Sequence, residues 1–297
     1  VSTNGREYTS SGVSFEVVSL FVRGIAPWSG PVLGGTVVTI AGSHLAHSSE
    51  SLQCRFGVSS APPSSASAHG ADGVRCVSPP ALPTGWSSIE LSMHGAALRS
   101  GGSLYVHSAL YASELVPPAG PVSGGTRVSV LGSGFREAAT LRCRFEGSGA
   151  TSAARRVSSG HLQCTSPPSS SAAARHVSLS ANGQQFAHSG ASFTYRPAAS
   201  VSSVWPTSGA SEGGTPLTVL GSGFSSAAES MGALRCRFNG TVVPAAYVSE
   251  SALSCNMTAS SAGLASVEVS TNGREYTSSG VSFEVVSLVV RGVAPWS

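Results

Sequence analysis

Six cysteines carry the clearest chemistry in this sequence. They form three close pairs with gaps of 22, 21 and 19 residues: Cys54 with Cys76, Cys143 with Cys164, and Cys236 with Cys255. There is no Cys-x-x-Cys motif and no clustered histidine. An even count with one close pair per segment favours three disulfides over zinc binding. We therefore expect an oxidising compartment, and buried free thiols in a cytosolic protein are the alternative.

Asparagine and proline mark candidate sites for covalent glycans. Asn239 and Asn256 each begin an Asn-x-Thr acceptor sequence, and Asn239 falls at the tip of an expected hairpin. Ser-Pro-Pro stretches resemble the hydroxyproline O-glycosylation sites of plant and algal wall proteins, with these candidate residues: Pro79, Pro80, Pro167, Pro168, Ser169 and Ser170. Chance acceptor sequences and ordinary extended loops are the alternatives. A glycan coat would explain how a chain with only 10% charged residues stays in solution.

Arginine and tryptophan recur at matching places. One arginine per segment stands between cysteine and phenylalanine: Arg55, Arg144 and Arg237. Such a row could contact a neighbouring chain or an acidic glycan, although a solvated strand face is favoured. One tryptophan stands at the entrance to three expected domains: Trp28, Trp205 and Trp296. These rings could stack on sugars, but a position at the junction between domains is favoured.

No catalytic, cofactor or metal site is predicted. His44 and His47 are the only histidine pair near metal-ligand spacing, and no third ligand accompanies them. There is no Gly-x-Ser-x-Gly turn, and the glycine-rich stretches precede strands instead of the helices that phosphate loops require. We therefore expect a protein that is not an enzyme.

The strands that position these residues follow a turn motif that occurs three times. It ends in Gly-Gly-Thr at residues 34–36, 124–126 and 213–215. A strand with alternating apolar residues follows each copy, and then a strand of the form Leu-x-Cys-x-Phe. The period of two puts its apolar residues on one face, so the cysteine points inward. Each cysteine pair can thus join two facing strands through a core.

Each segment is expected to close with a hairpin. Asn4-Gly5, Asn182-Gly183 and Asn272-Gly273 are type I′ turn signals, and His94-Gly95 holds the same place in the first segment. About seven short strands per 90 residues, with a cysteine pair across the core, predict an all-β chain of immunoglobulin-like sandwiches.

These motifs resemble those of the IPT/TIG domain (immunoglobulin-like, plexin, transcription factor). The shared pattern is Gly-Pro-x-x-Gly-Gly-Thr, a Gly-x-Gly-Phe turn, Cys-x-Phe-x-Gly and a later Cys-x-Ser-Pro-Pro, and it covers nearly the whole chain. The third copy departs at Ala210 and at Asn256-Met257-Thr258, which affects turn geometry but not the fold. The resemblance implies tandem immunoglobulin-like sandwiches of the E-set type in a linear array.

A longer repeat encloses the shorter one. Residues 1–29 recur at 269–297 with only two differences, Phe21 against Val289 and Ile25 against Val293, so we infer an array whose unit is three domains. The expected boundaries are 1–17 for the closing hairpin of a preceding domain, then 18–110, 111–198, 199–285, and 286–297 for the start of the next. Short linkers with proline and β-branched residues favour limited hinge motion.

Composition narrows the class of protein. All seventeen basic residues are arginine, and the net charge of +3 is spread thinly, which excludes a nucleic-acid footprint. The apolar runs are too short to span a membrane, and a signal peptide, if one exists, is expected outside this segment. Junctions between domains that bind calcium need several aspartates, and this chain has a single one, Asp72. We therefore do not expect calcium to stiffen the junctions.

These observations predict a structural protein at the cell surface or outside the cell. We expect a glycosylated filament, surface hair or wall component whose partners are further copies of itself and glycans, with no cofactor beyond covalent glycans. The resemblance also allows an adhesive receptor ectodomain that binds a protein or glycan. A DNA-contacting use of the fold would require reduced cysteines and a basic loop cluster.

Overall fold

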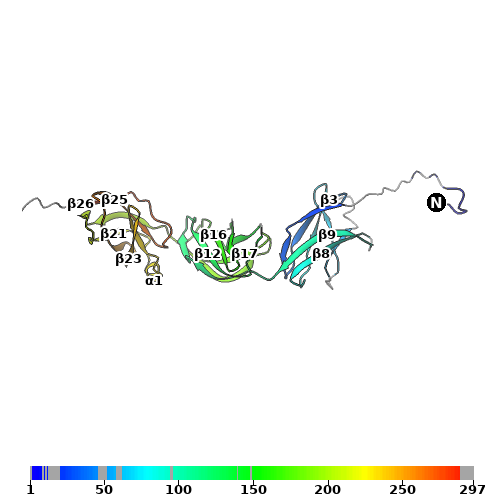
Figure 1. The fold of residues 1–297 in the computed structure, drawn as a ribbon, viewed down its shortest axis with the longest axis horizontal. Coiled ribbons are helices and arrows are strands. Elements are labelled where there is room, and N and C mark those ends of the chain that lie inside the picture. The colour runs from blue at the N-terminus through cyan, green and yellow to red at the C-terminus, as the bar shows by residue number, and fades with distance from the viewer. Residues whose placement is uncertain are drawn as a thin grey trace, which may run out of the picture. The chain divides into compact units, whose positions relative to one another are not determined.

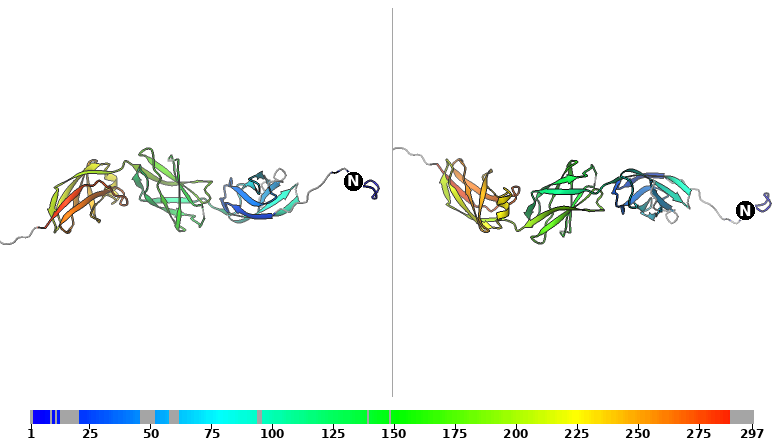
Figure 2. Two further views of the ribbon diagram at one scale, coloured as in Figure 1. Left: turned by 90° about the horizontal axis from the view of Figure 1, so that it is seen from above. Right: turned by 90° about the horizontal axis from the view of Figure 1, so that it is seen from below.

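A computed structural model describes residues 2–8, 10, 12, 21–45, 52–57, 62–93, 96–138, 140–147 and 149–287, without the side chains of residues 93–100. The chain divides into two compact units, residues 1–108 and 109–297. Strands account for nearly all the regular structure in the described ranges (Figures 1 and 2). The first unit holds one sandwich and the second unit holds two.

The first sandwich packs a four-stranded sheet on a five-stranded sheet. The first sheet has the order β1 (Phe21–Ala26), β3 (Val37–Ser43), β7 (Gly73–Val77) and β6 (Ser67–Ala68). The second has the order β2 (Ser29–Pro31), β9 (Ala96–His107), β8 (Gly85–Met93), β4 (Leu52–Phe56) and β5 (Ser64–Ser65). The β2–β9 pair is parallel and the other pairs are antiparallel.

The second sandwich repeats this topology. One sheet has the order β10 (Tyr111–Val116), β12 (Arg127–Ser133), β16 (His161–Thr165) and β15 (Arg155–Ser158). The other has the order β11 (Ala119–Pro121), β18 (Ala187–Arg196), β17 (Ala174–Ser180), β13 (Arg142–Phe145) and β14 (Thr151–Ala153).

In the third sandwich the two sheets are joined by one long strand. The order is β19 (Ser200–Trp205), β21 (Pro216–Ser222), β24 (Ala252–Asn256), β23 (Thr241–Ser249), β22 (Arg235–Phe238), β25 (Gly263–Ser270), β26 (Ser282–Val286) and β20 (Ser208–Ala210). The first half of β23 pairs with β22 and its second half with β24. The short α1 (Ser226–Ser230) lies between β21 and β22.

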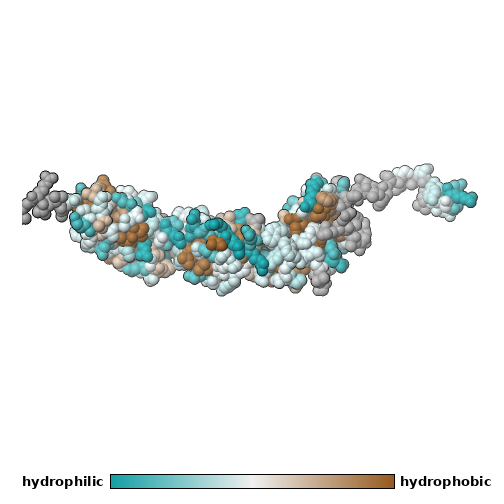
Figure 3. Space-filling view, in the orientation of Figure 1, coloured by the Kyte–Doolittle hydropathy of each residue, from teal (hydrophilic) through white to brown (hydrophobic). Residues whose placement is uncertain are grey.

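Alternation along the strands builds a separate hydrophobic core in each sandwich of the described residues. β4 has the burial pattern buried, exposed, buried, exposed, buried, which places Leu52, Cys54 and Phe56 inside as predicted. Apolar side chains on the outer surface gather only in small patches on the face drawn in Figure 3. In each sandwich the leucine, cysteine and phenylalanine of the Leu-x-Cys-x-Phe segment are buried in the core.

The Gly-Gly-Thr turn and the Ser-Pro-Pro segment are two halves of one contact. The Ser78 hydroxyl accepts a hydrogen bond from the Thr36 amide at 3.1 Å, and Ser166 does the same for Thr126. A Cβ on Gly124 would lie 2.6 Å from the Pro167 carbonyl carbon, whereas one on Gly125 would meet nothing within 4 Å. Both glycines have positive φ, which side chains disfavour. The motif spacing thus encodes a backbone contact between two loops.

The Asn-Gly hairpins differ from the prediction. A type I′ turn needs positive φ at both central residues, but at Asn182-Gly183 and Asn272-Gly273 only the glycine has it. The Asn272 carboxamide oxygen instead accepts hydrogen bonds from the amides of Arg274 and Glu275. The same bonds form at Asn4 and Asn182, so the asparagine organises a wider Asx loop. His94-Gly95 lies outside the described residues.

Candidate interaction surfaces

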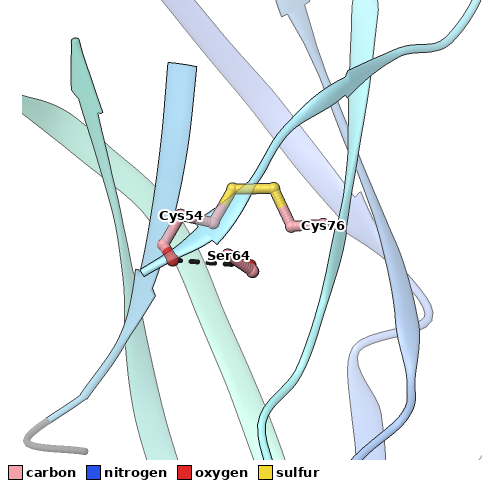
Figure 4. The surroundings of a disulfide bond; sticks show 3 residues. All are labelled: Cys54, Ser64 and Cys76. Carbon is pink, nitrogen blue, oxygen red and sulfur yellow. Dashed lines mark hydrogen bonds between the residues drawn. A yellow bond between two sulfur atoms is a disulfide. The ribbon is translucent and has the colours of Figure 1, made fainter. Parts of the chain in front are cut away.

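Each predicted cysteine pair is a disulfide that joins the two sheets of its own sandwich. Cys54 on β4 is bonded to Cys76 on β7, Cys143 to Cys164 and Cys236 to Cys255, and all six are buried. Figure 4 shows the first pair beside Ser64, whose hydroxyl donates to the Cys54 carbonyl at 3.5 Å. The residues that the structure describes contain no free cysteine. The sulfur chemistry of this chain is therefore structural.

The two N-glycan acceptors lie at exposed positions. Asn239 and Gly240 form a two-residue turn between β22 and β23, and Asn239 has φ of 47°. The Asn239 carboxamide oxygen accepts from the Ser266 amide at 2.8 Å, and its nitrogen donates to the Leu264 carbonyl at 3.4 Å. Asn256 is the exposed last residue of β24. Both amide groups are thus at the surface, where a glycan could be attached.

The Ser-Pro-Pro candidates are divided by burial. Pro80, Pro168 and Ser170 are exposed, while Pro79, Pro167 and Ser169 are half-buried. The Ser169 hydroxyl donates to the Ser171 carbonyl at 2.9 Å. The exposed members are the ones that could accept O-glycans without loss of the loop contact described above.

The three arginines do not share one environment. The Arg144 guanidinium lies 4.2 Å from the centre of the Phe186 ring, and Arg237 lies 4.2 Å from that of Tyr276. Both aromatic residues follow an Asn-Gly loop, so the loop covers the arginine of its own sandwich. Arg55 is exposed on β4 opposite Glu90 of β8. Arg55 is therefore the arginine of this row that is most open to a partner.

A single carboxylate, that of Glu146, lies in the field of Arg144. The Ser178 hydroxyl donates to Glu146 at 2.5 Å, and His188 lies 2.9 Å from the same carboxylate. The hydrogen bond from Ser178 lowers the pKa of the Glu146 carboxyl, and the charges of His188, Arg144 and His176 act in the same direction against partial burial. Glu146, Ser178 and His188 thus form a polar network on the second sandwich.

A buried tyrosine connects this sandwich to its Ser-Pro-Pro loop. The Tyr195 hydroxyl donates to the Pro167 carbonyl at 2.8 Å, and the ring contacts Phe193 edge-on with centroids 5.1 Å apart. Burial raises the pKa of Tyr195 to about 12. The neutral phenol is therefore the form that fits the fold.

Three aromatic rings gather on the outer face of the first sandwich. The ring centres of Trp28 and Trp86 lie 6.1 Å apart and 29° from parallel. Tyr105 meets both rings edge-on, with centroids 6.4 Å from Trp28 and 5.3 Å from Trp86. Trp28 is 39% exposed and Trp86 is 67% exposed. We call Trp28, Trp86 and Tyr105 the aromatic triad.

Of the three tryptophans expected to pack at domain junctions, only Trp205 lies between two sandwiches of the same described unit. Among the described residues, Trp28 makes ring contacts with Trp86 and Tyr105 of its own sandwich, and residues 13–20, which precede that sandwich, lie outside the described ranges. Trp205 is 72% exposed, so the contact between the second and third sandwiches does not cover it. Trp296 lies outside the described residues.

The second and third sandwiches contact each other through an Asn-Gly loop. The Thr126 hydroxyl donates to the Glu275 carboxylate at 2.9 Å, and the Asn272 side-chain amide donates to the Ala119 carbonyl at 3.4 Å. The Asn272 amide also donates to Glu275, so one loop holds its own shape and reaches the neighbouring domain. A further hydrogen bond joins the two sandwiches, because Arg196 donates to the hydroxyl of Ser225, the residue before α1.

The described ranges contain neither a candidate metal site nor a helix that could span a membrane. No group of three or more potential His, Cys, Asp or Glu ligands occurs there, and no described helix is long and apolar enough to span a bilayer. His44 is exposed with φ of 62°, and His47 lies outside the described residues.

Comparison with known proteins decides the family. The sequence profile of the IPT/TIG domain matches residues 20–107, 110–195 and 199–285. The chain belongs to the IPT/TIG family. Each matched IPT/TIG range contains one of the three disulfides and one of the three cores.

Relatives of this IPT/TIG chain include plexins. It is 28% identical over 207 residues to Plexin-2 of Caenorhabditis briggsae, a match that covers 67% of the chain but only 11% of that protein. The extracellular region of Plexin A4 aligns with a TM-score of 0.49 and 20% identity, over 88% of this chain and 23% of that one. SGBP-B of the mixed-linkage glucan utilization locus of Bacteroides ovatus, in complex with a mixed-linkage heptasaccharide, aligns with a TM-score of 0.26 and 12% identity, over 92% of this chain and 69% of that one.

Two features of these surfaces were missed from the sequence. Trp86 and Tyr105 are far from Trp28 in the chain, and only strand pairing brings the three rings together. Glu275 and Thr126 are 149 residues apart. Alignment of the three repeats could have shown that the first alone has aromatic residues at these positions.

Proposed function

We propose that this chain is a segment of an extracellular structural protein in which three-domain IPT/TIG units recur in series to form a filament, surface hair or wall fibre. The observation that carries the proposal is the near-identity of residues 1–29 and 269–297. The two copies start 268 residues apart, which is the length of three domains. Residues 269–297 therefore repeat the same part of the three-domain unit as residues 1–29.

Disulfides and junction contacts support a load-bearing role. A bond across each core removes much of the freedom of the unfolded chain, and oxidised cysteines are typical of extracellular proteins. The Glu275 loop gives the second and third sandwiches a specific contact. Self-association and attached glycans complete the proposal: copies interact along the fibre, and Asn239, Asn256 and the exposed prolines carry the coat.

Electron microscopy of the native material tests this function. We expect thin fibres with a regular axial repeat about three domain lengths long. The diameter of the fibres should decrease after enzymatic removal of glycans. Isolated compact particles without an axial repeat would contradict it.

An adhesive receptor ectodomain is the second candidate, and the 28% identity to a plexin favours it. In that function the IPT/TIG domains would form the stalk of a receptor, and an anchor would lie elsewhere in the protein. Detergent dependence separates the two: a receptor is released from cells only by detergent, whereas a wall or surface fibre is released by chaotropic washing or shear.

A further inference from the structure

We propose that the aromatic triad of the first sandwich is a carbohydrate-binding platform that takes a glycan built of pyranose rings. The site goes beyond the fibre function, because it lies within one domain and can be assayed on this chain alone. Trp28, Trp86 and Tyr105 provide the platform, and the neighbouring polar residues of the same sheet face provide hydrogen bonds.

The position of the triad on the sheet makes the rings available. Trp86 and Tyr105 are cross-strand partners on β8 and β9, and the Tyr105 amide donates to the Trp28 carbonyl at 2.8 Å. Exposed fractions of 39% for Trp28 and 67% for Trp86 leave much of both indoles in solvent. Apolar side chains that are exposed as a contiguous group, unlike single ones, mark interaction sites.

The surroundings of the rings are polar. Ser88 and Ser103 are exposed cross-strand partners next to Trp86 and Tyr105, and Arg55 and Glu90 are exposed cross-strand partners further along the same sheet. The faces of pyranose rings carry C–H groups that suit the negative face of an indole, while their edges carry hydroxyls that bind polar side chains. Apolar rings bordered by serine hydroxyls and by the charged residues Arg55 and Glu90 therefore match the faces and the edges of a sugar ring.

The other two sandwiches supply an internal comparison. The Thr194 amide donates to the Pro118 carbonyl at 2.9 Å, and the Glu284 amide donates to the Thr207 carbonyl at 2.9 Å. By this hydrogen bond Pro118 and Thr207 correspond to Trp28. Thr194 and Glu284 correspond to Tyr105. Ala174 and Leu264 hold the place of Trp86 opposite them. The fold therefore does not need aromatic residues at these positions, and the first sandwich has them for another reason.

The size of the patch argues against a second copy of the chain as the occupant. If a buried aromatic side chain covers up to about 250 Å², the exposed parts of both indoles amount to about 260 Å². A stable protein interface needs about 800 Å² from each partner. One or two sugar rings fit the smaller area.

Affinity gel electrophoresis of this chain tests the platform, with hydroxyethylcellulose, β-mannan, xylan or polygalacturonate in the gel. We expect at least one polysaccharide to retard the chain, and Trp86→Ala and Trp28→Ala each to weaken retardation about tenfold. Trp205→Ala is the matched control, since this equally exposed tryptophan contacts no other ring in the described part of the chain. Thermal melting verifies that each variant is folded.

Three results would overturn the platform. One is the absence of retardation by all four polysaccharides. Another is equal weakening by Trp205→Ala and Trp86→Ala. The third is a change in sedimentation of the Trp86→Ala chain without a change in retardation, which would assign the triad to self-association. A null result here would leave the axial repeat of the fibres untouched, so the two proposals fail separately.

Discussion

Tyr195 shows how one side chain couples stability to pH at the residue scale. The folded state holds its phenol neutral, with a pKa of about 12 against an ordinary value near 10. The stabilisation is fully present below pH 10 and is lost as pH rises from about 10 towards 12, because the unfolded chain ionises first.

We predict that Tyr195→Phe removes this alkaline loss of stability in the second sandwich. The variant also loses the hydrogen bond to the Pro167 carbonyl, at a cost of about 1 kcal/mol at neutral pH. Denaturation curves at a series of pH values measure both effects. An unchanged alkaline slope in the variant would assign the slope to other groups.

The cysteines allow a second prediction at this scale. Replacement of Cys143 and Cys164 by alanine opens a loop of 21 residues and should destabilise the second sandwich by about 3 kcal/mol. Amide hydrogen exchange on β12 and β16 measures the effect in that domain alone. The same replacement at Cys54 and Cys76, in the other compact unit, is the control and should leave that exchange unchanged.

At the scale of elements, the Gly-Gly-Thr turn packs against the Ser-Pro-Pro loop in the first and second sandwiches. Gly124→Ala brings a Cβ within 2.6 Å of the Pro167–Pro168 backbone at a positive φ, and we predict a loss of about 3 kcal/mol or more. Gly125→Ala meets open space and should cost about 1–2 kcal/mol for φ alone.

Urea denaturation of both glycine variants checks this pair. The prediction depends on the difference between them, so it is insensitive to general effects of alanine in the turn. Equal losses would mean that the turn moves away from the proline segment and that the contact is not a constraint.

Strand patterns were predictable because burial follows a period of two, and Leu52, Cys54 and Phe56 illustrate it. The Asn-Gly loops were wrongly predicted because Asn272 uses its side chain instead of a left-handed backbone. The aromatic triad was not predictable from local patterns. Trp86 and Tyr105 become neighbours only through the β8–β9 register, which depends on the whole sheet.

At the scale of the whole molecule, the Glu275 loop is the point at which one domain recognises another. Glu275 accepts from Thr126 across the junction and from Asn272 within its loop. The segment Asn4-Gly5-Arg6-Glu7 repeats the sequence of 272–275, so the same loop recurs with the longer repeat.

We predict that Glu275→Ala widens the range of orientations between the second and third sandwiches without unfolding either one. The lost hydrogen bonds are worth about 1–2 kcal/mol together. Single-molecule energy transfer between dyes on the two domains measures the width of the distance distribution. Glu284→Ala, an exposed glutamate of the same domain, is the control, and an unchanged width for Glu275→Ala would contradict a role for this loop.

Stretching single molecules of the native protein tests the central claim of disulfide-pinned domains repeated in series. Each domain should give one unfolding step, and steps should outnumber those of one three-domain unit. Reduction should lengthen every step by about 70 Å, since the 19–22 residues locked between cysteines then extend at about 3.5 Å each. Only three steps per native molecule, or steps unchanged by reduction, would contradict the account.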